Sequence, residues 1–147
     1  MTTVIPRELA RLHGHALDGY PHEVVGILAG DRASGVVTSV RPLVNERADS
    51  PSNRYHVSAL HLMRAEQQVE AEGLEVVGYY HSHPNHPARY SDFDREHALP
   101  NMTYVIVSIV RDASGRPAVA ETCAWRLRDD RSAMDPEILS RPEARTA

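Results

Sequence analysis

The sequence predicts an α/β (α+β) fold in which helices pack on a mixed β-sheet. Segments with helical periodicity alternate with short apolar segments that are typical of strands, which favours a layered arrangement. Two pairs of strand-like segments are separated by short turns that contain glycine, and such hairpins add antiparallel strand pairs. The chain has 147 residues, which is enough for one domain with its own core.

Residues 5–21 predict the first helix. Apolar side chains recur there at helical spacing, Pro6 occupies a position compatible with the first turn, and Pro21 ends the segment. Two short apolar segments follow, at residues 23–30 and 35–44, and the turn GDRASG lies between them. They predict a pair of strands joined as a hairpin.

The middle of the chain predicts a loop, a helix and a strand. Residues 45–55 are polar and rich in turn formers, as expected for a loop. Residues 58–73 predict the most regular helix, with Ser58 as its N-cap and Gly73 at its carboxyl end. Residues 74–83 predict a strand.

The last part of the chain predicts a short helix, two strands and a tail. Residues 91–98 form the expected helix, and residues 103–110 and 116–127 form the strands on either side of the turn DASG. Beyond them the sequence is charged and contains proline, which predicts a helix-poor or loosely attached segment. We therefore expect one domain over residues 1–128 and a charged tail over residues 129–147.

Composition excludes several classes of function. The net charge is −4, from 16 basic and 20 acidic residues, and the basic residues form no run, so neither nucleic acid nor a membrane is an expected partner. Cys123 is the single cysteine, which excludes an intrachain disulfide and a multi-cysteine zinc site. The amino terminus lacks the apolar region of a signal peptide. We expect a cytoplasmic protein.

The segment GYYHSHPNHPARYSDFD contains a candidate metal-binding pair. On a strand, residues two apart point to the same face, so His81 and His83 present two imidazoles together while Ser82 faces away. Pro84 ends the strand because it has no N–H group for the ladder. Taken alone, the pair is also compatible with surface or core histidines that happen to alternate.

Ser91 and Asp94 have two interpretations. Their spacing is that of a capping box, in which the serine caps a helix and the acid reaches back to the serine amide. The same cap places the Asp94 carboxylate at the first turn, facing the residues that precede the helix. Two imidazoles and one carboxylate are a common ligand set for catalytic zinc, with a fourth position left for water.

Glu23 is the candidate general base for such a site. It opens the buried segment EVVGILAG, where a carboxylate is costly unless something pairs with it. The alternative is a solvated glutamate at the rim of a strand. Two carboxylates, Asp94 and Glu23, would balance the charge of Zn²⁺.

Together these residues resemble a known signature. The stretch HSHPNHPARYSDFD resembles the motif of the JAMM/MPN metallopeptidases, in which H-x-H-P is followed by six residues, a serine, two residues and an aspartate. The segment PHEVVGILAG is similar to the upstream segment of that family, and the resemblance runs from about Pro21 to Val110. It implies the JAMM/MPN fold, a mixed, curved β-sheet flanked by helices, with an architecture related to the cytidine deaminases.

The resemblance also implies a role for each residue of the motif. His81, His83 and Asp94 would bind one Zn²⁺ per chain. Glu23 would activate the water and pass its proton to the leaving amine. Ser91 would help to stabilise the oxyanion that forms on the scissile carbonyl.

The resemblance further implies a substrate. Family enzymes typically cleave the amide or isopeptide bond after the C-terminal glycine of a ubiquitin-like protein. The short connectors around the motif resemble those of compact bacterial members, which process ubiquitin-like sulfur-carrier proteins, for example during cysteine biosynthesis. We therefore expect a carrier with a Gly-Gly tail as the partner, and this tail could add as a strand beside a sheet edge. The sequence does not define the leaving group.

A scaffold is the alternative function. Metal-free proteins of this fold bind partners without catalysis, and they usually lack one or more ligands. The present chain retains His81, His83, Ser91, Asp94 and Glu23, which favours the zinc metallopeptidase.

Other residues have weaker claims to a role. His86 follows Pro84 on a turn and is expected to be solvated or near the substrate, and Asn45 is a candidate for binding the tail. Leu62 and Met63 belong to the core, or face a partner if the chain forms a homodimer, which the sequence leaves open. The remaining candidates are expected to be structural or surface residues: His13, His15, His61 and Cys123.

Overall fold

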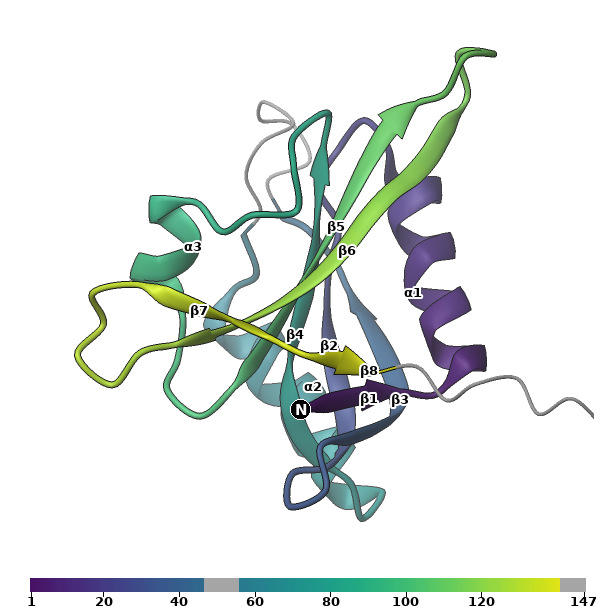
Figure 1. The fold of residues 1–147 in the computed structure, drawn as a ribbon. Helices are drawn as coiled ribbons and strands as arrows, with labels where there is room; N and C mark the ends of the chain where they lie inside the picture. Colours follow the sequence, from purple (N-terminus) through teal and green to yellow (C-terminus); the bar gives the residue numbers. More distant parts are fainter. Residues whose placement is uncertain (47–55, 141–147) are drawn as a thin grey trace, which may run out of the picture.

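The computed structural model describes residues 1–46 and 56–140, and these residues form three helices and one eight-stranded sheet (Figure 1). The loop expected at residues 45–55 lies outside this part from residue 47 onward. The elements follow one another as β1 (Thr2–Val4), α1 (Pro6–Gly19), β2 (Val25–Asp31), β3 (Val36–Leu43), α2 (Ala59–Ala71), β4 (Glu75–Pro84), α3 (Asp92–His97), β5 (Thr103–Arg111), β6 (Pro117–Leu127), β7 (Met134–Glu137) and β8 (Leu139–Ser140).

Local sequence signals set the ends of the helices. Pro6 begins α1, where a missing N–H group costs nothing because the first turn has no intrahelical acceptor for it. The Ser58 side chain caps α2 by accepting a hydrogen bond from the amide of His61. Gly73 follows α2 with a φ of +79°, a conformation that glycine adopts without strain. The three expected helices are confirmed.

The sheet is mixed, as expected. Its strand order is β7-β6-β5-β4-β2-β3-β1-β8. The hairpins β2–β3 and β5–β6 are antiparallel, whereas β4 and β5 are parallel because α3 connects them. All five strands expected from the sequence are therefore present, and β4 lies in the middle of the sheet between β2 and β5.

Helices cover both faces of the sheet. In Figure 1, α1 and α3 lie on opposite sides of it. Leu9, Leu12 and Ala16 of α1 pack into one buried apolar cluster. The other cluster contains Val69 of α2 and Ala98, which follows α3. Apolar burial on both faces is the main stabilising contribution of this arrangement.

The segment after residue 128 completes the sheet. Its strand β7 pairs with β6, and β8 pairs with β1 at the other end of the strand order. Only Ile138 separates these two strands in the chain, so the sheet curves until its two ends meet. Residues 134–140 are thus hydrogen-bonded to the domain instead of being loosely attached, and the sheet extends beyond the boundary expected at residue 128. Residues 141–147 of the expected tail lie outside the described part.

Glu137 anchors this segment to three other parts of the chain. Its carboxylate accepts hydrogen bonds from Thr2 at 3.1 Å, from Thr103 at 2.7 Å and from Arg126 at 3.3 Å. These bonds join β7 to β1, β5 and β6, which explains why a short, charged strand is retained at this position. In the described ranges, no helix has the length and apolar character needed to cross a membrane.

Candidate metal centre

The two histidines of the motif lie side by side on β4. The Nε2 atoms of His81 and His83 are 3.2 Å apart, and both residues are buried. Pairing with the neighbouring strands fixes their positions, because His81 is opposite Val25 of β2 and Ile106 of β5. The two-residue repeat of a strand therefore brings both imidazoles to the same face, as the sequence predicted.

Asp94 reaches the histidines from the first turn of α3. Its Oδ1 lies 3.1 Å from Nε2 of His81, and its Oδ2 lies 3.2 Å from Nε2 of His83. The expected capping box is present, since Ser91 Oγ accepts the Asp94 amide at 3.1 Å and Asp94 Oδ2 accepts the Ser91 amide at 2.8 Å. The helix cap and the cluster therefore use the same two residues.

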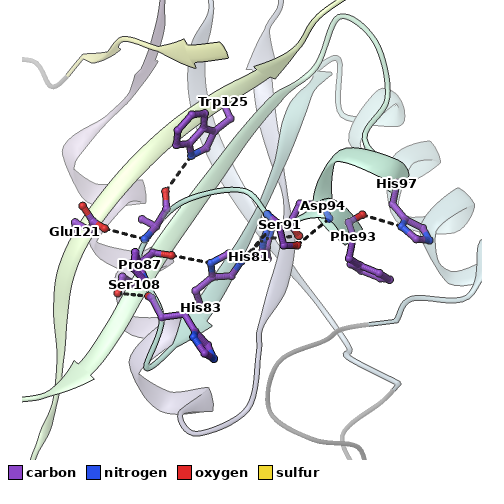
Figure 2. Close-up of polar contacts among 12 residues, drawn as sticks. His81, His83, Pro87, Ser91, Phe93, Asp94, His97, Ser108, Glu121 and Trp125 are labelled. Carbon is purple, nitrogen blue, oxygen red and sulfur yellow. Dashed lines mark hydrogen bonds and ion pairs between the residues drawn. The ribbon is translucent and has the colours of Figure 1, made fainter. Parts of the chain in front are cut away.

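One atom from each of these three side chains could coordinate a single metal ion. The three atoms lie within 4.8 Å of one another, and all three residues are buried. The Nδ1 atom of His83 is 2.9 Å from the carbonyl oxygen of Pro87. A carbonyl oxygen only accepts, so Nδ1 carries the proton and Nε2 keeps its lone pair for a metal. Figure 2 shows these side chains together.

The electrostatics of the cluster favour a charged carboxylate. Burial alone would raise the pKa of Asp94, but the imidazoles of His81 and His83 and the amide of Ser91 lower it below its ordinary range. Burial alone would lower the pKa of His83, but the Asp94 carboxylate and the Pro87 carbonyl raise it. The negative charge of Glu23 contributes to this rise, so the site has a surplus of negative charge that suits a cation.

Glu23 lies two residues before the start of β2, next to the cluster. It is buried, and it lines a pocket of about 440 Å³ together with His83 and Ser91. Its backbone carbonyl accepts a hydrogen bond of 2.8 Å from the side chain of Asn45. Asn45, expected as a candidate for substrate binding, thus holds the backbone of the candidate base.

A second pocket adjoins the first at Phe93. It has a volume of about 360 Å³, and its lining is largely apolar and aromatic. Phe93 of α3 lines both pockets. His86 lines the first pocket, and its carbonyl accepts a hydrogen bond of 2.6 Å from Ser108.

The remaining sequence candidates lie away from the cluster. His13 contacts Thr122 at 2.9 Å and His15 contacts Tyr80 at 2.8 Å, both from α1 on the opposite face of the sheet. Three other candidates lie on α2. His61 contacts Glu46, Leu62 packs against the core and Met63 is half exposed. Burial raises the pKa of the Cys123 thiol, which does not favour a nucleophile.

Three residues near the cluster were not predicted from the sequence. Ser108 of β5 and Glu121 and Trp125 of β6 form hydrogen bonds to the connector between β4 and α3. Their proximity depends on the register of β4, β5 and β6, which no local motif indicates. The β4–β5 crossover and the β5–β6 hairpin bring them there.

The arrangement as a whole is suited to hydrolysis at a metal ion. Three protein ligands leave a coordination position open, which distinguishes catalytic zinc sites from structural ones with four protein ligands. A buried residue, Glu23, and an exposed one, Ser91, line the same pocket as the candidate ligand His83. Such groups are the ones needed to accept a proton and to donate a hydrogen bond to a developing oxyanion.

Two known proteins are similar in sequence to most of the chain. The chain is 36% identical over 99 residues to the desampylase of Haloferax volcanii, covering 64% of this chain and 70% of that protein. It is 39% identical over 103 residues to a probable TtuB-protein conjugate cleaving protease of Thermus thermophilus, covering 69% of this chain and 67% of that protein.

Solved structures show the same fold. A protein from Desulfitobacterium hafniense superposes with a TM-score of 0.78 and 25% identity, covering 98% of this chain and 94% of the other. A JAB1/MPN domain protein from Archaeoglobus fulgidus gives a TM-score of 0.59 at 19% identity, covering 97% of this chain and 100% of the other. The family model described as prokaryotic homologs of the JAB domain matches residues 6–128. The chain therefore belongs to the prokaryotic JAB family, the JAMM/MPN group that its motif resembles.

Proposed function

We propose that this protein is a zinc-dependent metallopeptidase that hydrolyses the amide or isopeptide bond after the C-terminal glycine of a ubiquitin-like sulfur-carrier protein. The observation that carries the proposal is the convergence of His81, His83 and Asp94 within 4.8 Å at a buried site, beside Glu23. The names of the two relatives, a desampylase and a conjugate cleaving protease, support the same class of reaction.

The donor set fits zinc. Two imidazole nitrogens and one carboxylate oxygen are ligands that zinc accepts in catalytic sites, and the hydrogen bond from His83 to Pro87 orients the ring for binding through Nε2. When bound, zinc supplies a water molecule with a pKa near 7 and polarises the carbonyl under attack. One ion per chain is proposed because the described residues contain one such cluster.

Glu23 would move the protons of the reaction. Its carboxylate is buried next to the cluster, where it can accept a proton from the attacking water and deliver that proton to the leaving amine. General acid–base catalysis of this kind contributes a rate factor of about 10²–10⁴. The bond from Asn45 to the Glu23 carbonyl would keep the carboxylate at the distance that proton transfer requires.

Ser91 would stabilise the oxyanion. Its oxygen accepts the amide of Asp94, so its own hydroxyl proton remains available for a bond to substrate. The residue is exposed and lines the pocket that contains Glu23. A donor in this position acts on the charge that develops on the scissile carbonyl oxygen.

The substrate tail would lie in the two pockets that share Phe93. The candidate ligands lie on the central strand β4 and on α3, and Glu23 lies just before β2, which pairs with β4. The pocket lined by Glu23, His83 and Ser91 would take the terminal Gly-Gly, whose residues lack side chains that could clash beside the buried ligands, and the pocket on the other side of Phe93 would take the residues before it.

Cleavage of a carrier fused at its Gly-Gly terminus tests this function. The substrates would be one sulfur carrier joined through glycine to a peptide and to a lysine side chain, with products identified by mass spectrometry. Glu23→Gln should retain zinc and lose about 10²–10⁴-fold in turnover, because it removes the base but no ligand. Glu70→Gln, at an exposed position of α2, is the matched control and should have wild-type turnover. Near-normal turnover of Glu23→Gln would contradict the assigned base, and cleavage by zinc-free protein would contradict the metallopeptidase.

A further inference from the structure

The connector between β4 and α3 is held by side chains from three adjacent strands. Ser108 Oγ donates to the carbonyl of His86 at 2.6 Å, His83 Nδ1 donates to the carbonyl of Pro87 at 2.9 Å, and Glu121 Oε1 accepts the amide of Ala88 at 2.8 Å. Three consecutive residues of the connector are therefore fixed one after another (Figure 2).

The strand register explains this succession. His83 of β4 is opposite Ser108 of β5, and Ser108 is opposite Glu121 of β6. Residues opposite each other in adjacent strands project from the same face of a sheet, so the three side chains form one row across it. The connector lies over this row, and each side chain meets a different peptide group.

Trp125 holds the next peptide unit of the connector, between Ala88 and Arg89. Its Nε1 donates to the Ala88 carbonyl at 3.0 Å, while Glu121 binds the Ala88 amide. Ala88 is fully buried, so both of its backbone groups depend on these partners. Pro87 has no N–H group of its own, and its carbonyl belongs to the peptide unit whose amide Glu121 binds. Glu121 therefore sets the direction of the Pro87 carbonyl.

We propose that Glu121 is a positioning residue for the metal centre. It acts through the Pro87–Ala88 peptide, whose carbonyl accepts the hydrogen bond from His83 Nδ1 and thereby holds Nε2 toward Asp94. The inference rests on the proposed zinc function. Residues that orient a ligating histidine in this way change metal affinity by about 10–100-fold when they are removed.

A solvated glutamate on an exposed strand is the competing explanation. Glu121 is exposed, and on that explanation its removal would alter neither the ring orientation of His83 nor the binding of a metal. Cys123 provides a matched comparison, because its Sγ lies 3.9 Å from the other carboxylate oxygen, Oε2, and takes no part in the row. The two explanations therefore predict different results for variants at neighbouring positions of one strand.

The test measures zinc affinity and the His83 tautomer separately. Zinc dissociation constants would be obtained by competition with a chromophoric chelator for the wild type, Glu121→Ala, Glu121→Gln and Cys123→Ala. We expect Glu121→Ala to weaken binding by about tenfold or more, whereas Glu121→Gln retains an acceptor oxygen and stays within about twofold of the wild type, as does Cys123→Ala. Long-range ¹H–¹⁵N NMR spectra of the metal-free protein would show His83 protonated at Nδ1 in the wild type and partly at Nε2 in Glu121→Ala.

Each outcome bears on a different claim. Unchanged zinc affinity and tautomer in Glu121→Ala would overturn the positioning role, and equal weakening in the alanine and glutamine variants would assign the effect to charge instead of the hydrogen bond. A wild-type protein that binds no zinc would overturn the proposed function. The NMR spectra would still test the positioning of His83 in that case, because they do not require the metal.

Discussion

Ser82, the residue between the two candidate ligands, is hydrogen-bonded to the residue after the candidate base. Ser82 Oγ accepts the amide of Val24 at 2.9 Å, and the Ser82 amide donates to the Val24 carbonyl at 3.1 Å. Both residues are buried. The side chain that faces away from the metal cluster thus fixes the distance between the strand with the ligands and the segment with Glu23.

Ser82→Ala should therefore weaken the fold and displace the base without removing a ligand. The Val24 amide would be left buried without its acceptor, which costs about 1–3 kcal/mol in the free energy of unfolding. Turnover should fall while zinc content stays at the wild-type value. Denaturant unfolding measures the first effect, with Thr38→Ala, an exposed hydroxyl on β3, as the control that should change stability by less than about 0.5 kcal/mol. Equal stability of Ser82→Ala and the control would contradict a stabilising role for the bond between Ser82 and the Val24 amide.

Serine caps on two of the described helices separate folding from catalysis. Ser58 caps α2 and Ser91 caps α3, each by accepting one backbone amide. Substitution of either by alanine should lower the free energy of unfolding by about 1 kcal/mol, because each removes a cap. Only Ser91→Ala should also lower turnover, by about 10²-fold or more, since it removes the donor to the oxyanion. If both variants lost turnover in proportion to stability, Ser91 would be only a helix cap.

Most of the fold could be predicted because its main elements carry strong local signals. β5 is rich in β-branched residues, and α1 has a proline at its start. β1, β7 and β8 were missed because they are short, and the sequence of β7, MDPE, contains two charges and a proline. Pairing with distant strands and the bonds of Glu137 stabilise β7, and local sequence indicates neither.

The three candidate ligands could also be predicted from local patterns in the sequence. The two-residue repeat of β4 identified His81 and His83 as neighbours, and the capping box located Asp94. Glu121 was not identified because the sequence around it is typical of a strand in which apolar and polar residues alternate, and a glutamate in such a strand is expected to be solvated. Its role appears only when the register of three strands is known.

Glu137 should make stability depend on pH. Burial alone would raise the pKa of Glu137, but its bonds to Thr103, Arg126 and Thr2 lower that pKa below 4.5. A carboxyl whose pKa is lowered in the folded state stabilises it above the ordinary pKa, and this stabilisation is lost as the pH falls through the lowered value. Glu137→Gln should therefore reduce the free energy of unfolding at pH 7, by about 1–2 kcal/mol, and progressively less below pH 4.5.

Asp135 provides the control for this pH dependence. It lies on the same strand and pairs with Arg128 at 2.9 Å, but both side chains are about half exposed. An exposed ion pair contributes little, so Asp135→Asn should change stability by about 0–1 kcal/mol at either pH. A Glu137→Gln effect that persisted unchanged at low pH would show that the carboxylate charge is not what holds β7.

The zinc content of the purified protein tests the central claim most directly. It would be measured per chain for the wild type, for Asp94→Ala and for Asp92→Ala, which removes an exposed acid from the same first turn of α3. We predict about one zinc per chain in the wild type and in Asp92→Ala, because His81, His83 and Asp94 form one three-ligand site. Asp94→Ala should lose the ion or bind it far more weakly. Absence of zinc from the wild type after the metal is added back, or full zinc content in Asp94→Ala, would contradict the assigned centre.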